Sequence, residues 1–208
     1  MRPKLKISNL INLQDARSSA AVGFDLISFS LERGNDKKLS ASLIWNIVNW
    51  LSGPGIVLEM NVASLEELSE VEKMFSWKYI TIPASEWNDL IFSYTDAVIL
   101  RTDHTATPEE IQRLVQLAES MEKELKFEIQ LPAISAAKTY SAVAKHIFFH
   151  FPDIDEAEAY IQSGDFQPYG FSFGEEAEEE PGLLNYQRID DFLEIFADHF
   201  PESGHITV

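Results

Sequence analysis

Short β-type runs alternate with helical patterns along this chain, and each kind of segment occurs eight times. The predicted strands are Lys4–Ser8, Asp25–Glu32, Gly55–Asn61, Lys78–Pro83, Ala97–Asp103, Lys126–Leu131, His146–Phe151 and Tyr169–Gly174. The predicted helices are Leu13–Val22, Ser40–Leu51, Ser64–Phe75, Ser85–Phe92, Pro108–Glu124, Ile134–Ala144, Ile154–Ser163 and Tyr186–Phe200. Strict alternation is typical of a parallel sheet, and eight units favour closure into a barrel. We therefore predict an α/β fold, a (β/α)8 barrel, with residues 1–208 as a single domain.

A doubly wound open sheet is the alternative architecture for such a pattern. The sequence contains no Gly-x-Gly-x-x-Gly or P-loop motif that would favour it. Local signals support the helix boundaries, since Ser64-Leu-Glu-Glu reads as a capping box and Thr107 precedes Pro108 at a first helical position. Gly23 and Gly53 stand where helices should end.

The alternation of side chains within each strand predicts an unusual lumen. Successive residues of a barrel strand face the helices and the lumen in turn. If the apolar set of each strand packs on the helices, four charged side chains fall in the middle of the lumen: Lys6, Glu59, Arg101 and Glu128. Unpaired buried charges are costly, so we expect these four to form ion pairs. Two interpretations remain open, a salt-bridge network without activity and a charged floor beneath a site.

The carboxyl ends of the strands are where barrel enzymes place their chemistry. The same alternation puts there Ser8, Glu32, Asn61, Pro83, Asp103, Gln130, His150 and Gly174. Glu32, Asp103 and His150 could transfer protons. Ser8 is a weak nucleophile unless a base activates it.

Charge and cysteine content limit the partners and the location. The chain carries 34 acidic and 16 basic residues, a net charge of −18, and phosphate binding needs clustered Lys and Arg. We therefore expect no nucleic-acid partner and no binding to anionic membranes. The absence of cysteine excludes disulfides and thiolate metal sites. The first residues show the pattern of neither a signal peptide nor a membrane span, so we expect a cytoplasmic location.

Three smaller features complete the predictions. The glutamate run from Glu175 to Glu180 is interpreted as a solvated loop, with weak attraction of calcium or magnesium as the alternative. Trp45, Trp50 and Leu51 lie on or near one predicted helix; they could form part of the core or a partner surface, and the core is the favoured interpretation. Asp153 is predicted to cap the helix that follows the seventh strand, rather than to bind a metal.

Several segments resemble one enzyme family in order along the chain. They are Lys6-Ile-Ser-Asn-Leu-Ile11, Asn12-Leu-Gln-Asp-Ala16, Ala21-Val-Gly-Phe-Asp25, Ser172-Phe-Gly-Glu-Glu176, Pro181-Gly182 and Ile189-Asp-Asp-Phe192. These are similar to phosphoribosylanthranilate isomerase, with its Lys-x-Cys-Gly-Ile-Thr opening and its late Ser-Ser-Gly-Val-Glu pattern. The resemblance implies a (β/α)8 barrel and a reaction of tryptophan biosynthesis, the Amadori rearrangement of a phosphorylated aminoaldose.

The resemblance also shows which functional groups are replaced. It assigns the general base to the position of Ser8, where the family has Cys, and the general acid to the position of Gln130, where the family has Asp. A hydroxyl is a poorer base than a thiolate, and an amide does not donate a proton in that role. The positions implied to bind substrate are Lys37, Asn61, Ser172 and Gly174.

The phosphate site of the family is replaced as well. Its glycines at the end of the seventh strand correspond to Phe149-His-Phe-Pro152, and the second Ser of its late pattern corresponds to Phe173. Glycine lets backbone amides approach a phosphate, so we expect these bulky side chains to block that approach.

Two function classes follow. The first is a barrel like phosphoribosylanthranilate isomerase without ordinary isomerase activity, which acts as a binding or interaction protein for a small molecule or a protein partner. The second is an isomerase or another small-molecule enzyme with a rearranged site, using Ser8, Glu32, Asp103, Gln130 and His150. No cofactor is implied, and a monomer or homodimer is expected. A barrel mouth plugged by phenylalanine side chains would favour the binding or interaction protein. Perturbed pKa values of side chains in an open pocket would favour the enzyme.

Overall fold

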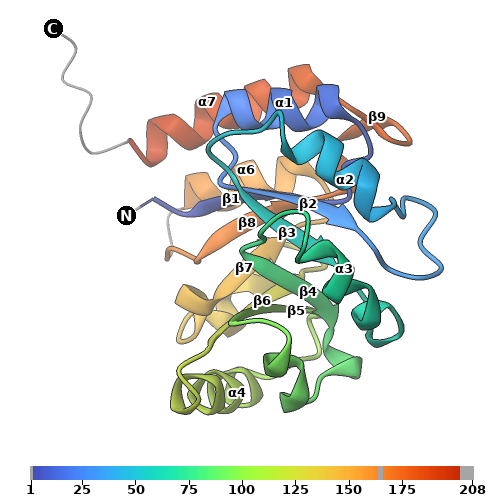
Figure 1. Ribbon diagram of the computed structural model, residues 1–208. Helices are drawn as coiled ribbons and strands as arrows, with labels where there is room; N and C mark the ends of the chain where they lie inside the picture. Colours follow the sequence, from blue (N-terminus) through green and yellow to red (C-terminus); the bar gives the residue numbers. More distant parts are fainter. Residues whose placement is uncertain (1, 164–165, 202–208) are drawn as a thin grey trace, which may run out of the picture.

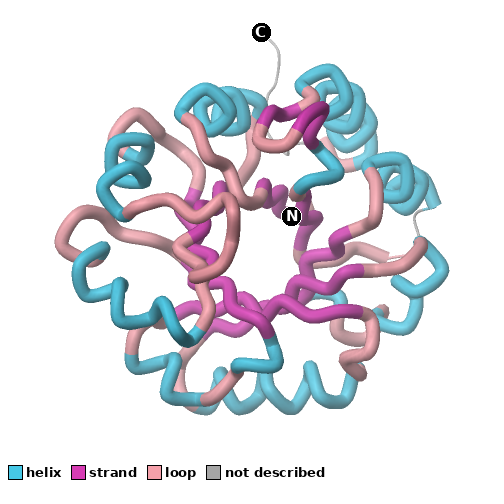
Figure 2. Tube along the Cα trace, turned by 90° about the vertical axis from the view of Figure 1, so that its right-hand side faces the viewer, coloured by secondary structure: helices cyan, strands magenta, loops and turns pink. Residues whose placement is uncertain are grey.

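The computed structural model describes residues 2–163 and 166–201. Eight parallel strands close into a barrel in sequence order, and a layer of helices surrounds them (Figures 1 and 2). The strands are β1 (Lys4–Ile7), β2 (Leu26–Ser30), β3 (Gly55–Glu59), β4 (Tyr79–Pro83), β5 (Ala97–Asp103), β6 (Glu124–Gln130), β7 (Ile147–His150) and β8 (Gly170–Phe173). Pairing of β1 with β8, Lys4 opposite Gly170, closes the ring. The predicted (β/α)8 barrel is confirmed.

Seven α-helices lie in the described part of the chain. They are α1 (Leu13–Val22), α2 (Ala41–Val48), α3 (Leu68–Val71), α4 (Pro108–Ser120), α5 (Ile134–Ala137), α6 (Ile154–Ser163) and α7 (Tyr186–His199). The predicted start of α4 is confirmed, since the Thr107 hydroxyl accepts from the Glu110 amide at 3.2 Å and the Glu110 carboxylate accepts from the Thr107 amide at 3.0 Å. The predicted cap of α6 is confirmed as well, because the Asp153 carboxylate accepts from the Glu156 amide at 2.8 Å.

The predicted helix between β4 and β5 is wrong. Two 3-10 turns, η2 (Ala84–Glu86) and η3 (Asp89–Ser93), take its place. Trp87 between them is extended, and the Asn88 side chain accepts from the Leu90 amide at 3.1 Å to start the second turn. Such local side-chain hydrogen bonds compete with a continuous helix.

The predicted helix after β3 is also shorter than expected. It begins as the 3-10 segment η1 (Val62–Glu67) before α3. Asn61, rather than Ser64, is its N-cap residue, and the Asn61 amide donates to the Ser64 hydroxyl at 3.1 Å. The helix predicted after β6 breaks after α5 into the 3-10 turn η4 (Lys138–Tyr140).

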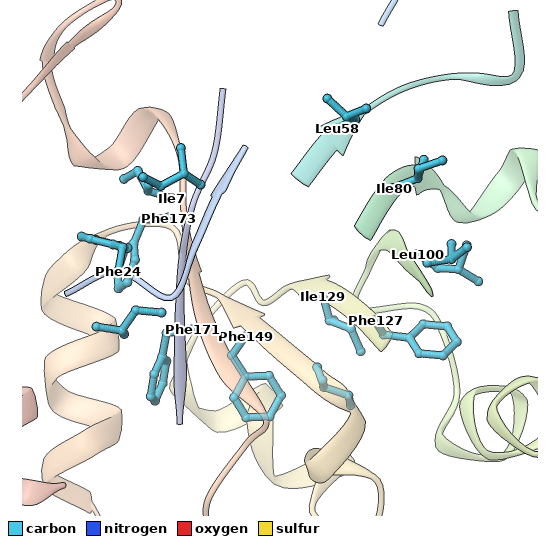
Figure 3. Packing of buried hydrophobic residues seen from close by; sticks show 14 of the residues in the cluster. Ile7, Phe24, Leu58, Ile80, Leu100, Phe127, Ile129, Phe149, Phe171 and Phe173 are labelled. Carbon is cyan, nitrogen blue, oxygen red and sulfur yellow. The ribbon is translucent and has the colours of Figure 1, made fainter. Parts of the chain in front are cut away.

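The apolar side chains of the strands form the main core between the barrel and the helices (Figure 3). Phe171 packs against Phe192 of α7 with ring centroids 6.4 Å apart, and Phe149 packs against Tyr160 of α6 at 5.5 Å. Phe173 contacts Phe192 in the same layer at 4.8 Å. Phe149 and Phe173 therefore point into the helix interface and do not plug the mouth of the barrel. The expectation that their side chains block the approach of a phosphate is wrong for the same reason. Their bulk fills the helix interface instead.

A second, smaller apolar cluster fills the lumen toward the amino ends of the strands. It consists of Leu26, Val57, Tyr79, Ala97, Ile99 and Phe148. The Tyr79 hydroxyl donates to the Glu124 carboxylate at 2.6 Å, which satisfies the one polar group of the cluster. This cluster thus closes the lumen at the amino ends of the strands. The charged side chains of the lumen lie nearer the carboxyl ends.

Trp45 and Trp50 are not core residues, contrary to the sequence-based prediction. Trp45 is 41% exposed and Trp50 is 70% exposed. Helix α2 buries Ile44 and Ile47, which lie three residues apart on one face, and this leaves Trp45 on the other side. Within the described residues, no helix is both long enough and apolar enough to cross a membrane.

Candidate functional site

Lys6 is the centre of a charged network inside the barrel. Its ammonium is 2.7 Å from the Glu128 carboxylate, 3.2 Å from the Glu59 carboxylate and 2.5 Å from the Ser8 hydroxyl. The side chain is fully buried. Burial alone would lower the pKa of Lys6, but Glu128 and Glu59 outweigh it and raise that pKa. Lys6 is therefore a cation at neutral pH.

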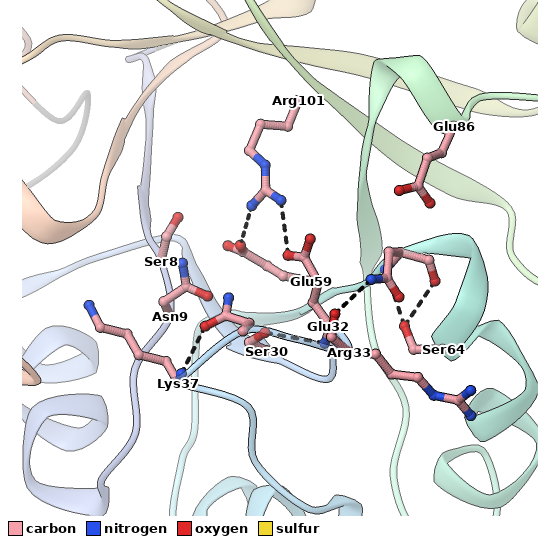
Figure 4. A network of polar contacts seen from close by, with 12 residues as sticks. Ser8, Asn9, Ser30, Glu32, Arg33, Lys37, Glu59, Ser64, Glu86 and Arg101 are labelled. Atoms are coloured by element: carbon pink, nitrogen blue, oxygen red, sulfur yellow. Dashed lines mark hydrogen bonds and ion pairs between the residues drawn. The ribbon is translucent and has the colours of Figure 1, made fainter.

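Glu59 links this cation to a second one. It accepts from Arg101 at 2.9 Å, and Arg101 also pairs with Glu32 at 3.0 Å (Figure 4). Glu59 accepts in addition from the Ser28 hydroxyl at 2.5 Å. Burial would raise the pKa of Glu59, but Lys6, Arg101 and the Ser28 hydrogen bond lower it to about 2. The predicted pairing of the four lumen charges is confirmed, and the network forms the floor of a cavity.

A cavity of about 710 Å³ opens above this floor at the carboxyl ends of the strands. Residues of β1, β5, β6, β7 and β8, or of the loops that directly follow them, supply most of its wall. The lining residues are Ser8, Asn9, Glu59, Arg101, Asp103, His104, Glu128, Gln130, Leu131, Pro132, His150, Pro152, Gly174, Glu175 and Glu176. The cavity is open to solvent and carries more carboxylates than cations.

Five of the predicted site residues meet in this cavity: Ser8, Asp103, Gln130, His150 and Gly174. Gln130 and His150 are paired in register on β6 and β7. The Ser8 amide donates to the Phe173 carbonyl at 2.8 Å, which fixes Ser8 beside the end of β8. Asp103 is exposed at the rim, where hydrogen bonds from Thr105 lower its pKa.

The other four predicted site residues lie outside the cavity wall. Glu32 is held by Arg101, and Lys37 is held by Glu178 at 2.7 Å. The Asn61 side-chain amide donates to the Arg33 carbonyl at 3.0 Å, so Asn61 ties two loops together. Ser172 is buried in β8, opposite Lys6 in the register with β1.

The sequence reasoning missed Glu176. It belongs to the 3-10 turn η6 (Glu175–Ala177) directly after β8, and its side chain is only 10% exposed. One carboxylate oxygen lies 3.4 Å from His150 Nε2, and the other accepts from the Gly174 amide at 2.7 Å. The solvated-loop interpretation of the glutamate run is therefore wrong for this residue. The one signal for it in the sequence was its match to the Glu of the late family pattern.

The glutamate run also forms structure further along. β9 (Glu178–Glu180) and β10 (Leu183–Leu184) make a short antiparallel hairpin. Glu178 accepts from the Gly182 amide at 2.8 Å and pairs with Lys37. The hairpin is thereby tied to the loop after β2.

The chemistry available at the mouth is hydrogen bonding and proton transfer. Ser8 accepts from the Lys6 ammonium, so its own proton is free to donate toward the cavity. Burial raises the pKa of Glu176, and the nearby His150 opposes that rise. Within the described ranges, no group of three or more His, Asp or Glu side chains is arranged to hold a metal ion.

Comparisons with known proteins agree on the fold. The sequence matches no protein-family model and no curated protein sequence. Among solved structures, the phosphoribosylanthranilate isomerase of Thermus thermophilus superposes with a TM-score of 0.75 and 17% identity, over 94% of this chain and 98% of that one. A phosphoribosylanthranilate isomerase bound to reduced 1-(o-carboxyphenylamino)-1-deoxyribulose 5-phosphate gives 0.74 and 17%, over 94% and 99%.

A third similar structure describes monomers generated from the dimeric phosphoribosylanthranilate isomerase of Thermotoga maritima. Its TM-score is 0.72 at 15% identity, over 95% of this chain and 97% of that one. At these identities the likeness establishes the shared barrel fold. The expected resemblance to this family therefore holds in three dimensions over almost the whole chain.

Proposed function

We propose that this chain is a divergent relative of phosphoribosylanthranilate isomerase that lacks ordinary isomerase activity and binds a small polar molecule at the barrel mouth. Two independent likenesses support the descent. The similar structures cover more than nine tenths of the chain. The ordered sequence matches begin at Lys6 and end at Phe192.

The environment of Ser8 is the observation that carries the proposal. Ser8 stands where the resemblance places the catalytic base, and its oxygen accepts from the Lys6 ammonium at 2.5 Å. A protonated Lys6 cannot remove the Ser8 proton, so the side chain that contacts the Ser8 hydroxyl does not activate it as a base would. Gln130, in the position of the acid, has no titratable proton. The two groups that the rearrangement needs are thus both absent from their positions.

The charge of the cavity also opposes a phosphorylated substrate. Asp103, Glu175 and Glu176 line the mouth above two buried glutamates, whereas Arg101 is the one Lys or Arg in its wall as far as the structure describes the chain. A field of this sign repels a phosphate dianion. We therefore propose a ligand that is small, polar and unphosphorylated.

The test is the isomerase assay on the purified chain with phosphoribosylanthranilate, following the loss of substrate fluorescence. A Ser8→Cys/Gln130→Asp variant and a known phosphoribosylanthranilate isomerase run beside it. We expect neither turnover nor saturable substrate binding by the unmodified chain, while the known enzyme is active. Turnover by the unmodified chain above the no-enzyme control would refute the proposal.

A second candidate is an enzyme that uses the rearranged mouth, and the contact between His150 and Glu176 favours it. A carboxyl group and an imidazole 3.4 Å apart in one open cavity can pass a proton between them. Small unphosphorylated hydroxy-aldehydes and hydroxy-ketones are suitable probes in deuterated water. Deuterium incorporation at carbon that disappears in His150→Gln would support this candidate, and no incorporation would exclude it for those probes.

We further propose that residues 1–208 act as one domain, as a monomer or homodimer, in the cytoplasm. The dimeric isomerase of Thermotoga maritima supports the homodimer option by analogy of fold. Light scattering across a concentration series distinguishes the two states, and a larger assembly would contradict the proposal.

A further inference from the structure

A second cavity lies at the amino ends of the strands, at the opposite end of the barrel from the mouth. Its volume is about 450 Å³, and the segments that lead into β1, β2, β3, β4 and β8 supply its wall. Figure 1 shows the N-terminus on this side of the barrel and the hairpin of β9 on the other. Barrel enzymes place their chemistry at the carboxyl ends of the strands, so this cavity is separate from the candidate site. Its size is that of a pocket for a small molecule.

The wall of this amino-end cavity is positively charged, although the chain as a whole is acidic. Arg2, Lys4 and Lys78 line it, and Asp25 is the one acidic residue of its wall within the described ranges. The cavity therefore has an excess of two positive charges in a chain whose net charge is −18. Charged walls of one sign raise the local concentration of ions of the opposite sign. The amino-end cavity is thus suited to a small anion.

Asp25 holds two of these cations in position. Its carboxylate accepts from the Lys4 ammonium at 2.7 Å and from the Arg2 guanidinium at 2.9 Å. The Leu5 amide donates to the same carboxylate at 2.9 Å, which fixes Asp25 to the start of β1. A lysine ammonium has three protons to donate, and Asp25 accepts one of those of Lys4. The Lys4 side chain is 35% exposed, so its other protons can donate to a ligand.

Lys78 is the cation of this cavity that has no carboxylate partner. In the part of the chain that the structure describes, its ammonium forms no ion pair, and it lies 5.5 Å from the centroid of the Tyr79 ring. The stem of the side chain lies against Gly55, where a Cβ atom would be only 2.9 Å from Lys78 Cδ. Glycine at this position therefore lets Lys78 lie along the cavity wall. Its ammonium is available to form charge-assisted hydrogen bonds with an external oxyanion.

We propose that the amino-end cavity binds a small organic dianion, such as a dicarboxylate, with Lys78 and Lys4 as the contacts of its oxyanion groups. Two carboxylates match the excess of two positive charges in the wall. Pro54 and Tyr169 also line the cavity, and their carbon and ring surfaces can contact the skeleton of the ligand. This second site goes beyond the proposed function of the mouth and does not depend on it.

The experiment measures binding of succinate by calorimetry to the unmodified chain, Lys78→Ala and Lys73→Ala at one pH and ionic strength. Both variants remove one positive charge from the connection between β3 and β4, but Lys73 is exposed and does not line the cavity. We expect saturable binding by the unmodified chain, weaker by about tenfold in Lys78→Ala and by less than about twofold in Lys73→Ala. Equal losses in the two variants would show a general effect of charge and would overturn the proposal. The absence of saturable binding by the unmodified chain would overturn it as well.

Two control ligands test what the cavity recognises. Succinamide has the same carbon skeleton without the charges, and we expect it not to bind. Inorganic phosphate should bind more weakly than succinate, because it has no skeleton to contact Pro54 and Tyr169. Phosphate that binds as tightly as succinate would contradict recognition of an organic anion.

Nuclear magnetic resonance locates the bound succinate. The amide resonances of Gly53 and Gly55, which line the amino-end cavity, should shift on addition of succinate, while that of Gly174 at the mouth should not. A shift of Gly174 alone would place the ligand in the mouth and overturn the proposal. These results are separate from the isomerase assay, because Lys78 does not line the mouth. Turnover of phosphoribosylanthranilate refutes the proposed function alone, and absence of succinate binding refutes the second site alone.

Discussion

Lys6 lies at the centre of the charged interior of this barrel. Lys6 contacts two carboxylates that belong to β3 and β6, on different sides of the lumen. The three groups have almost no exposure to water, so the ion pairs are not screened by solvent. Removing one partner of a buried pair leaves an uncompensated charge, whose cost exceeds that of losing an exposed pair several times.

Lys6→Ala should therefore destabilise the fold by about 3–5 kcal/mol at neutral pH. The reason is that Glu59 and Glu128 keep their burial and lose their shared cation. Lys4→Ala is the matched control, because Lys4 lies on the same strand but its partly exposed side chain pairs with Asp25 at the barrel end. That change should cost at most about 1 kcal/mol. Urea unfolding of both variants checks this, and equal losses would contradict it.

The pKa of Glu59 predicts a specific acid dependence. Its folded pKa of about 2 lies below the ordinary value of 4.5. A lowered carboxyl pKa gives stability that is complete above pH 4.5 and lost as the pH falls from there toward 2. At 1.36 kcal/mol per pKa unit, the contribution is on the order of 3 kcal/mol.

Glu59→Gln should remove that acid-dependent contribution. The difference in unfolding free energy between the unmodified chain and Glu59→Gln is expected to be largest near neutral pH and to shrink between pH 4.5 and 2. Urea titrations at several pH values measure it. A difference that stays constant across this window would show that Glu59 does not titrate as described.

Among the elements, the strands could be predicted far better than the short helical segments. Strands such as Ala97–Asp103 carry both their β-type residues and their side-chain alternation in the sequence, and the structure reproduces those bounds. The connections after β3, β4 and β6 depend on packing and on local capping by residues such as Asn61 and Asn88. Those interactions compete with helix propensity, and no periodic pattern reveals them.

The candidate site was predictable in part for the same reason. The alternation of side chains along each strand placed Ser8, Gln130 and His150 at the mouth of the barrel, and these residues line the cavity there. The same alternation could not place Glu176, because Glu176 lies beyond β8 in a turn whose direction depends on the Gly174 amide. It also could not show that Lys37 is held by the hairpin of β9 and β10.

The close packing of β1 against β8, which closes the barrel, can be tested by substitution. A Cβ atom at Gly170 would lie 2.4 Å from the Lys4 carbonyl oxygen and 2.6 Å from the Phe148 ring. Gly170→Ala should therefore force these strands apart and cost about 3 kcal/mol or more. Gly174→Ala is the control, because its Cβ would meet nothing closer than 3.4 Å. Thermal unfolding of both variants decides, and a Gly170→Ala protein as stable as the control would contradict the packing.

At the scale of the whole molecule, charge is far from balanced. The chain has 34 acidic and 16 basic residues, so the folded state confines a net charge of −18. Self-repulsion of this kind destabilises a compact state. The exposed ion pairs add little stability against this repulsion.

Added salt should therefore stabilise the fold. Raising KCl from 0.01 M to 0.1 M shortens the Debye length from about 30 Å to about 10 Å, which screens repulsion between distant carboxylates. We expect the thermal midpoint to rise over this range, while the buried pairs of Lys6 remain unaffected. A midpoint that falls with salt would mean that surface attraction outweighs net repulsion.

The lumen network has a consequence for how such a chain can change over generations. Its charges come from β1, β3, β5 and β6, so no single segment contains a complete ion pair. A replacement at one position alters which replacements the others tolerate, and a return to an apolar lumen would require several coordinated mutations. Intermediate genotypes would carry an unmatched buried charge and fold poorly. Residues that line the mouth can be replaced one at a time. The charged residues of the floor constrain one another's replacements, so we expect them to change together.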